Sequence, residues 1–425
     1  MPAVPPEQMG VPHSVAPTNP PLKIRDLNPA TLNRLIAPMH AGVEVSDCEI
    51  LSRAACGDGV ASTADRLNLQ LEYRNNAAGL PDALVFKTLL LHPGFRLGLP
   101  AILSLSRAVR TAERLPGLGG AAGRALFVIV GAYQKYFPQA PDAMYEIESR
   151  FYREIRPQLD IEAPRVFGAE YDPRSRQFAV LMEDLSLREA RFPTAQESLP
   201  LETVRSTLRS MAQLHAAYWN APALQAELNW VPSRFAGGMY PVFDGIGLDL
   251  IRYQVSHHGF KQELIAPLGR DVDQLWQAMW DSQRLLQDGP QTLLHGDTHV
   301  GNSYVLPDGR GGLIDFQLLA KGHPMIDVSY YLMTALSVDQ RRAQERSLIS
   351  GYLEALRELG VDSAPDAETA WRDHRLASLW GLVIGWLITP PVNYGEAITR
   401  ANIERLSQAV ADLDPFTLIE AASRT

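Results

Sequence analysis

Residues 293–332 read LLHGDTHVGNSYVLPDGRGGLIDFQLLAKGHPMIDVSYYL. This stretch contains two short apolar runs, and each is followed closely by an acidic residue, Asp297 after the first and Asp315 after the second. Asn302 lies between them. Polar side chains directly after apolar runs are typical of a site on loops held by a scaffold, not of a hydrophobic core. The stretch therefore predicts that two Asp side chains and one Asn side chain share a small region of the fold.

A β-hairpin is expected to bring these three residues together. The turn PDGR at 307–310 contains the Asp-Gly pair that favours tight reversals, and residues 303–306 and 311–316 on its two sides predict the strands. Asn302 and Asp315 then lie at the open end of the hairpin. Asp297 lies on the loop just before it, so all three side chains can converge.

Phosphoryl transfer needs such a set of side chains. The protein has little covalent work in this reaction: one carboxylate orients the attacking hydroxyl, and two oxygen ligands hold Mg²⁺ on the nucleotide phosphates. In the protein-kinase signatures H-R-D-x-x-x-x-N and D-F-G, the Asp, the Asn and the second Asp have these roles. Here Asp297 and Asn302 keep that spacing and Asp315 opens D-F-Q. We therefore assign Asp297 as the catalytic residue and Asn302 and Asp315 as Mg²⁺ ligands.

Three departures from the protein-kinase signature narrow the choice of substrate. Gly296 stands in place of Arg, and Gln317 stands in place of the last Gly. Asp327 follows Asp315 too closely for a regulatory activation loop to fit between them. A chain without that loop is poorly suited to grip a protein, so the expected acceptor is a small molecule.

The whole pattern, H-G-D-x-H-x-G-N, then I-D-F-Q, then G-H-P-x-x-D, resembles the aminoglycoside phosphotransferase and choline kinase superfamily. Leu-His-Ala at 214–216 and Met-Glu-Asp-Leu at 182–185 are similar to its ecdysteroid kinase-like branch. The resemblance covers nearly the whole chain from about Asn28. It implies a two-lobed α+β protein-kinase-like fold, in which an antiparallel N-lobe sheet with one key helix faces a larger, mainly helical C-lobe. It also implies ATP and Mg²⁺ as cofactors and a small-molecule hydroxyl as the acceptor.

Further roles around the catalytic loop follow from the same resemblance. His295, His299 and Asp327 would support the loop. His215 is expected to be a structural core histidine.

A nucleotide-binding lobe is expected upstream. Gly57, Gly59 and Ser62 lie between a strand at 43–51 and an alternating run at 67–73, which is the form of a hairpin that covers phosphates with its backbone N–H groups. We assign these three residues to the nucleotide.

Lys87 ends the apolar strand at 84–87, where an ammonium group is costly to bury unless an anion meets it. In kinases the anions are the nucleotide phosphates and a helical Glu. A helix is expected at 143–155, and alignment with the superfamily selects Glu148 in it, with Glu146 as the alternative. The strand at 176–185 resembles the hinge that binds adenine. The residues assigned to that hinge are Met182, Glu183 and Leu185.

The chain is expected to divide into three parts, a tail indicated by composition and two lobes implied by the resemblance. Residues 1–25 are Pro-rich without an apolar period, which predicts a flexible tail. Residues 26–184 form the expected N-lobe and residues 185–425 the C-lobe. The sequence of an insert at about 92–141 predicts a pair of helices packed on the N-lobe. The alternatives are a homodimer contact or a lid over a lipophilic substrate.

Composition excludes several classes of function. The net charge of −9 argues against nucleic acid or an anionic membrane surface as partner. No apolar run reaches the length of a membrane span and no signal peptide is visible, so a cytoplasmic location is expected. The only cysteines, Cys48 and Cys56, cannot form a disulfide framework.

Two other functions fit part of the pattern. His295, Asp297 and His299 alternate as metal ligands on a strand do, which suggests a metal-dependent hydrolase but leaves Asn302 and Asp315 unexplained. A pseudokinase that binds nucleotide without catalysis is the second alternative. Every expected catalytic position is filled, which favours an active enzyme.

C-terminal helices are expected at 370–387 and 398–413, and Trp371, Trp380, Trp386 and Tyr394 make this part of the chain rich in aromatic residues. Few acidic residues lie between Ser378 and Pro391. An uncharged or lipophilic alcohol therefore suits this region better than a polycationic aminoglycoside.

Overall fold

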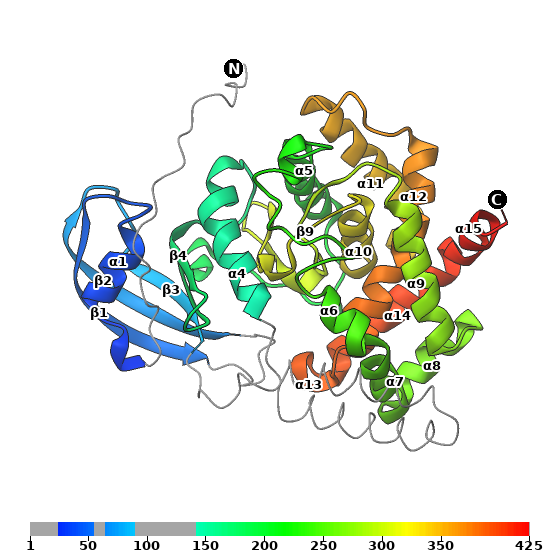
Figure 1. Ribbon diagram of the computed structural model, residues 1–425, viewed down its shortest axis with the longest axis horizontal. Helices are drawn as coiled ribbons and strands as arrows, with labels where there is room; N and C mark the ends of the chain where they lie inside the picture. Colours follow the sequence, from blue (N-terminus) through cyan, green and yellow to red (C-terminus); the bar gives the residue numbers. More distant parts are fainter. Residues whose placement is uncertain (1–23, 55–63, 90–141, 425) are drawn as a thin grey trace.

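A computed structural model describes residues 24–54, 64–89 and 142–424. In these ranges a five-stranded antiparallel sheet forms one side of the molecule, and a larger group of helices forms the other (Figure 1). The helix α4 (Asp142–Arg150) lies between them. This arrangement confirms the two-lobed α+β fold expected from the sequence. The assigned phosphate-loop residues Gly57, Gly59 and Ser62 and the insert at 92–141 lie outside the described residues, as do residues 1–23 of the tail.

The sheet of the smaller lobe has the strand order β1-β2-β3-β5-β4. Its strands are β1 (Val43–Ala54), β2 (Asp65–Asn76), β3 (Ala83–Thr88), β4 (Val166–Asp172) and β5 (Gln177–Glu183). The alternation of β2 is regular, because Leu67, Leu69 and Leu71 are buried while the positions between them are half-buried. These leucines share a core cluster with residues of α1 (Pro29–Ile36), whose first turn is capped by the side chain of Asn28.

The expected helix at 143–155 is α4 followed by a wider, π-helical turn over Phe151–Ile155. Phe151 stacks on Phe316 of the C-lobe, with ring centroids 3.8 Å apart and an angle of 13° between the rings. The apolar face of this helix therefore joins the N-lobe to the segment that carries Asp315.

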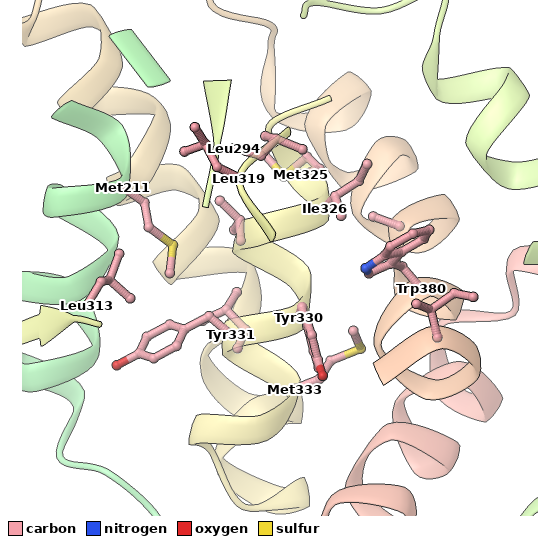
Figure 2. Packing of buried hydrophobic residues seen from close by; sticks show 14 of the residues in the cluster. Met211, Leu294, Leu313, Leu319, Met325, Ile326, Tyr330, Tyr331, Met333 and Trp380 are labelled. Atoms are coloured by element: carbon pink, nitrogen blue, oxygen red, sulfur yellow. The ribbon is translucent and has the colours of Figure 1, made fainter. Parts of the chain in front are cut away.

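The larger lobe surrounds α10 (Met325–Ala335), every residue of which is buried. Figure 2 shows Tyr330, Tyr331 and Met333 of α10 packed between Met211 and Trp380 of two neighbouring helices. The other helices of this lobe in the described residues are α5 (Leu201–Ala217), α6 (Tyr240–Val242), α7 (Leu248–His257), α8 (Gly259–Ile265), α9 (Val272–Leu286), α11 (Val338–Glu358), α12 (Ala367–Trp380), α13 (Pro391–Tyr394), α14 (Glu396–Leu413) and α15 (Pro415–Ala422). A π-helical segment, Gly381–Leu387, continues α12. No helix in the described ranges is long and apolar enough to cross a membrane.

Two small sheets carry the segment that contains Asp297, Asn302 and Asp315. The strand β6 (Thr292–Leu294) pairs with β9 (Ala320–Gly322), and β7 (Ser303–Val305) pairs with β8 (Gly311–Leu313). The expected hairpin exists, but its returning strand ends at Leu313, and the prediction that it continues to residue 316 is wrong. Asp315 has φ +66° and ψ +69°, a left-handed backbone that no β-strand can contain.

Candidate active site

Asp327, in the first turn of α10, holds the loop that follows β6. Its carboxylate oxygens accept the backbone N–H of His295 at 2.7 Å and that of Gly296 at 3.0 Å, and the hydroxyl of Thr298 donates to its carbonyl at 2.7 Å. Burial opposes ionisation of Asp327, but a hydrogen bond from His215 and the neighbouring positive charges outweigh it and lower its pKa. The loop is therefore fixed by a buried carboxylate.

His215 lies in the core behind this carboxylate. Its Nδ1 lies 2.7 Å from the hydroxyl oxygen of Tyr352, and its Nε2 lies 3.3 Å from an oxygen of Asp327. Its side chain is fully buried. This position fits the expected structural role of His215.

Position 296 in this loop can hold only a glycine. Its φ is +88°, and a Cβ atom there would lie 1.9 Å from the carbonyl oxygen of Leu318. The replacement of the protein-kinase Arg by Gly at this position is therefore explained by the lack of space for a side chain.

Asn302 joins Asp297 to the start of the hairpin. Its amide nitrogen donates to the Asp297 carbonyl at 2.9 Å and to the Asp297 carboxylate at 3.0 Å. One quarter of the Asp297 side chain is exposed, but protein atoms surround the rest. This desolvation raises the pKa of Asp297 to about 6, although His295, Asn302 and Arg234 oppose the rise. A carboxylate with such a pKa is ionised at neutral pH and can still accept a proton.

His299 faces Asp297 from inside a group of aromatic rings. Its Nδ1 accepts the backbone N–H of Gly301 at 3.1 Å, and its Nε2 lies 3.8 Å from an Asp297 oxygen. Burial lowers its pKa to about 4, so the ring is neutral with its proton on Nε2. The rings of Tyr330, Trp386 and Tyr394 have their centroids 6.0, 5.4 and 5.7 Å from that of His299.

The ring nitrogens of His295 are both engaged by backbone atoms. Nε2 lies 2.8 Å from the carbonyl oxygen of Ile314, and Nδ1 accepts the N–H of Asp297 at 3.2 Å. In the described residues, no group of three or more His, Cys, Asp or Glu is placed to hold a metal ion. The geometry therefore speaks against the alternative in which His295, Asp297 and His299 bind a catalytic metal.

Lys87 connects α4 to the segment that carries Asp315. Its ammonium donates to both oxygens of Glu148, at 2.8 and 2.9 Å, and to an oxygen of Asp315 at 3.3 Å. Lys87 and Glu148 are 4% and 1% exposed, whereas Glu146 lies on the exposed side of α4. The structure therefore selects Glu148 as the partner of Lys87. Burial opposes ionisation of Asp315, but Lys87 and then Arg66 outweigh it and lower its pKa.

Gln317 has a role that the sequence analysis missed. Its amide nitrogen donates to a carboxylate oxygen of Glu148 at 3.0 Å. The one available signal was that a side chain replaces the last glycine of the protein-kinase D-F-G. The contact itself joins residues far apart in the chain, so spacing could not reveal it.

The expected adenine contacts lie at the end of β5 and just after it. The N–H of Glu183 donates to the carbonyl of Arg165 at 2.9 Å, and its carboxylate accepts the N–H of Arg165 at 2.8 Å and pairs with Arg188. Its side chain and N–H group are thus engaged within the protein. Met182 and Leu185 flank it, and the assignment of all three residues to adenine remains a prediction.

Two arginines near the site were also missed. Arg66 of β2 lies opposite Lys87 in the β2·β3 register. Arg234 stacks its guanidinium 4.1 Å from the ring centroid of Trp380, and burial lowers its pKa to about 10 although the charges of Asp327 and Asp297 oppose this. The alternation of β2 could have revealed Arg66, but Arg234 lies in an irregular segment without a sequence pattern.

Comparison with known proteins gives one family match. Residues 131–361 match the model of the ecdysteroid kinase-like family, in agreement with the resemblance read from the sequence. A comparison with curated proteins finds no match.

Three similar solved structures have 15% identity or less to this chain. They include a choline kinase from Streptococcus pneumoniae, with 14% identity and a TM-score of 0.38 over 91% of this chain and 98% of that chain. An aminoglycoside phosphotransferase from Streptomyces rimosus has 15% identity and a TM-score of 0.37 over 82% and 95%. An ethanolamine kinase from Plasmodium vivax has 9% identity and a TM-score of 0.42 over 88% and 84%.

Proposed function

This chain belongs to the ecdysteroid kinase-like family, and from that membership and the site geometry we propose that it transfers the γ-phosphoryl group of ATP to a hydroxyl group of a small molecule. The observation that carries the proposal is the convergence of Asp297, Asn302, Asp315 and Lys87. Three hydrogen bonds link them in two pairs: two from Asn302 to Asp297, and one from Lys87 to Asp315.

Asp297 is the proposed base. The acceptor oxygen attacks the γ-phosphorus, the bond from that phosphorus to the bridging oxygen breaks, and ADP leaves with the electron pair. Asp297 orients the acceptor hydroxyl and takes its proton. Asn302 positions Asp297 for this task, because its amide nitrogen donates one hydrogen bond to the carboxylate and one to the backbone carbonyl of Asp297.

Asn302 and Asp315 fit a magnesium ion by the chemistry of their donors. An amide oxygen and a carboxylate are hard ligands, and Mg²⁺ on nucleotides is held by few such ligands together with the phosphates. When bound, the ion would neutralise charge on the phosphates. The amide nitrogen of Asn302 is used on Asp297, which leaves its amide oxygen for the ion.

Lys87 is the proposed phosphate ligand of the smaller lobe. Glu148 holds it by two hydrogen bonds, and Gln317 in turn holds Glu148. This chain of contacts keeps the ammonium group in place beside Asp315 before any nucleotide binds.

An uncharged or lipophilic alcohol is the proposed acceptor class. The aromatic rings of Tyr330, Trp386 and Tyr394 surround His299 next to Asp297. The stretch from 378 to 391, which supplies Trp386, contains no Asp or Glu. A polycationic acceptor would find little compensating charge there, whereas a flat apolar body packs well on aromatic rings.

Linked binding of Mg²⁺ and ATP tests the nucleotide site. Calorimetric titration should give weak Mg²⁺ binding to the protein alone and tighter binding with ATP present, and the gain must be equal in both directions. Asp315→Ala should abolish this coupling. Asp308→Ala is the matched control, because Asp308 lies exposed in the turn of the same hairpin and, among the described residues, pairs with Arg310. Tight metal binding without nucleotide, unchanged in Asp315→Ala, would contradict the proposal.

Turnover separates the enzyme from a pseudokinase that only binds nucleotide. ADP release should be measured against a panel of flat lipophilic alcohols and polycationic aminoglycosides. A pseudokinase would show the Mg²⁺–ATP coupling but no acceptor-dependent ADP release.

A further inference from the structure

Arg66 lies on the same face of the sheet as Lys87. The two residues are opposite each other in the antiparallel β2·β3 pair, and residues in that position point to one side of a sheet. The next pair along, Leu67 and Phe86, is fully buried in the core cluster on the other side, with α1. Arg66 therefore faces α4 and the catalytic segment, as Lys87 does.

Unlike its neighbours, Arg66 has no anionic partner in the described part of the chain. Lys87 is paired with Glu148 and Asp315, and Arg53 is paired with Asp65. Arg66 forms no ion pair there, although its side chain is half-buried. A guanidinium group that is partly removed from water without a partner is unfavourable unless a ligand supplies the negative charge.

The position of Arg66 between two functional groups indicates which ligand this is. Lys87, which lies opposite Arg66, donates to Asp315 at 3.3 Å, and the charge of Arg66 acts on both Asp315 and Tyr394. Asp315 is the proposed metal ligand, and Tyr394 belongs to the ring group beside Asp297. The guanidinium thus lies on the side of Lys87 where transfer to the acceptor would occur.

We propose that Arg66 binds the terminal phosphates of the nucleotide and so selects a triphosphate over a diphosphate or a monophosphate. The proposal rests on the proposed function, because it assigns a further contact to the same nucleotide site. A guanidinium group matches phosphate with two parallel hydrogen bonds, which the ammonium of Lys87 cannot do. The β2·β3 pair then presents the compact ammonium group of Lys87 next to the planar guanidinium group of Arg66.

The test compares nucleotide affinities of Arg66→Gln and wild type by calorimetry in the presence of Mg²⁺. We expect Arg66→Gln to bind ATP on the order of tenfold to hundredfold more weakly than wild type does. Its affinity for ADP should fall less, and its affinity for AMP should stay within about twofold of the wild-type value. Arg66→Lys should fall between the two, since it keeps the charge but loses the fork. The matched control is Arg74→Gln on the same strand, where the side chain is 72% exposed and pairs with Glu44.

Thermal unfolding without ligand supplies a second readout. Because Arg66 has no anionic partner among the described residues, Arg66→Gln should unfold at the wild-type temperature or above, while the stabilisation by ATP shrinks. A lower unfolding temperature without ligand would identify Arg66 as structural and overturn the inference. An equal loss of affinity for ATP, ADP and AMP, or no loss at all, would overturn it too. If wild type binds no nucleotide, the proposed function and this inference both fail; if wild type binds ATP and Arg66→Gln binds it equally well, only this inference fails.

Discussion

The ionised form of Asp297 is unfavourable for the stability of the fold, but it is the form that the proposed reaction needs. Its pKa is raised from 3.8 to about 6, which means that the folded chain binds this proton more tightly than the unfolded chain does. Between these two pH values the unfolded state loses the proton first, so the contribution of Asp297 to stability falls as pH rises. Above pH 6 the ionised carboxylate destabilises the fold, and the proposed reaction needs that same ionised form.

Asp297→Asn should therefore stabilise the protein and impair turnover. At pH 7.5 we expect a gain on the order of 1 to 3 kcal/mol in the free energy of unfolding. Turnover should fall by a factor on the order of 10² or more, with ATP affinity nearly unchanged. Denaturant titration and steady-state kinetics check the two effects.

The pH dependence supplies the control for this prediction. The stability gain of Asp297→Asn should shrink toward pH 4, where the wild-type carboxyl group is also neutral. Wild-type kcat/KM should rise with pH to a plateau above about 6. A gain in stability that is equal at pH 4 and pH 8 would contradict the raised pKa.

Gly296→Ala should destabilise the catalytic loop. The new methyl group would overlap the carbonyl oxygen of Leu318, and the residue would keep an unfavourable positive φ. We expect a loss of roughly 2 to 4 kcal/mol in the free energy of unfolding, measured by denaturant titration. Gly351→Ala is the control: it lies exposed within α11 with nothing near its Cβ position, and it should stabilise by roughly 0.5 to 1 kcal/mol. Similar losses in both variants would show that the loop is not sterically constrained.

Among the structural elements, the end of the π-helical segment Gly381–Leu387 depends on one buried ammonium group. Lys261 of α8 donates to the carbonyls of Trp386, Leu387 and Thr389 at 3.1, 3.0 and 2.6 Å. Its side chain is fully buried, and this desolvation lowers its pKa to about 7. Lys261 therefore fixes the turn that carries Trp386 toward His299.

Lys261→Met should alter the acceptor site and leave the nucleotide site intact. Three carbonyl groups lose their donor, so the turn loosens, and KM for the acceptor should rise severalfold with KM for ATP unchanged. Steady-state kinetics with each substrate varied in turn measures both. Equal increases in the two KM values would contradict a local role.

The linkage sign of Lys261 gives a second check. Its folded pKa lies below the unfolded value of 10.5, so the unfolded chain binds the proton more tightly between about pH 7 and 10.5. Wild-type stability should therefore rise with pH in that window relative to Lys261→Met. If the difference in unfolding free energy between wild type and Lys261→Met stays constant from pH 7 to 10, Lys261 is not desolvated.

The sequence predicts most of the elements that carry the site, and it fails where local pattern is silent. The hairpin after Asn302 and the helix that contains Glu148 were expected because their turn and apolar spacing are local signals. The end of the returning strand was missed because Asp315 adopts its left-handed backbone under tertiary constraint. The π-helical turns at 151–155 and 381–387 share their apolar pattern with an α-helix, so sequence cannot distinguish them.

Other omissions have different causes. The helix α9 was not assigned, although Asp271 and Gln274 form a capping box that a sequence can reveal. The fixed spacing of the motif predicts Asp297, Asn302 and Asp315 as site residues. It could not reveal Gln317, because the hydrogen bond of Gln317 to Glu148 joins distant segments.

At the scale of the whole molecule, the two lobes meet through a short polar chain. Glu148 of α4 binds Lys87 of the sheet and Gln317 of the C-lobe, and Lys87 also binds Asp315. This chain is buried beside the stacked rings of Phe151 and Phe316. Its central member is therefore expected to support the position of α4 as well as the nucleotide site.

Glu148→Gln should uncouple α4 from the site. Removal of this charge leaves Lys87 buried with a single weaker partner, and we expect a loss of about 3 kcal/mol in the free energy of unfolding. Hydrogen exchange in α4 should accelerate, and ATP should bind more weakly. Glu146→Gln on the exposed side of the same helix is the control and should change none of these. If Glu148→Gln and Glu146→Gln have the same unfolding free energy, hydrogen exchange in α4 and ATP affinity, the polar chain does not couple the lobes.

The stacking of Phe316 also bears on the design of inhibitors. Its ring lies against Phe151, close to Tyr152 and 4.4 Å from the ring centroid of His295, and the side chain is fully buried. A compound that binds only after this ring swings aside must first break the packing between the lobes. Under the proposed function, inhibitor design should therefore begin from flat nucleoside mimics that bind with the Phe316 ring in its present position.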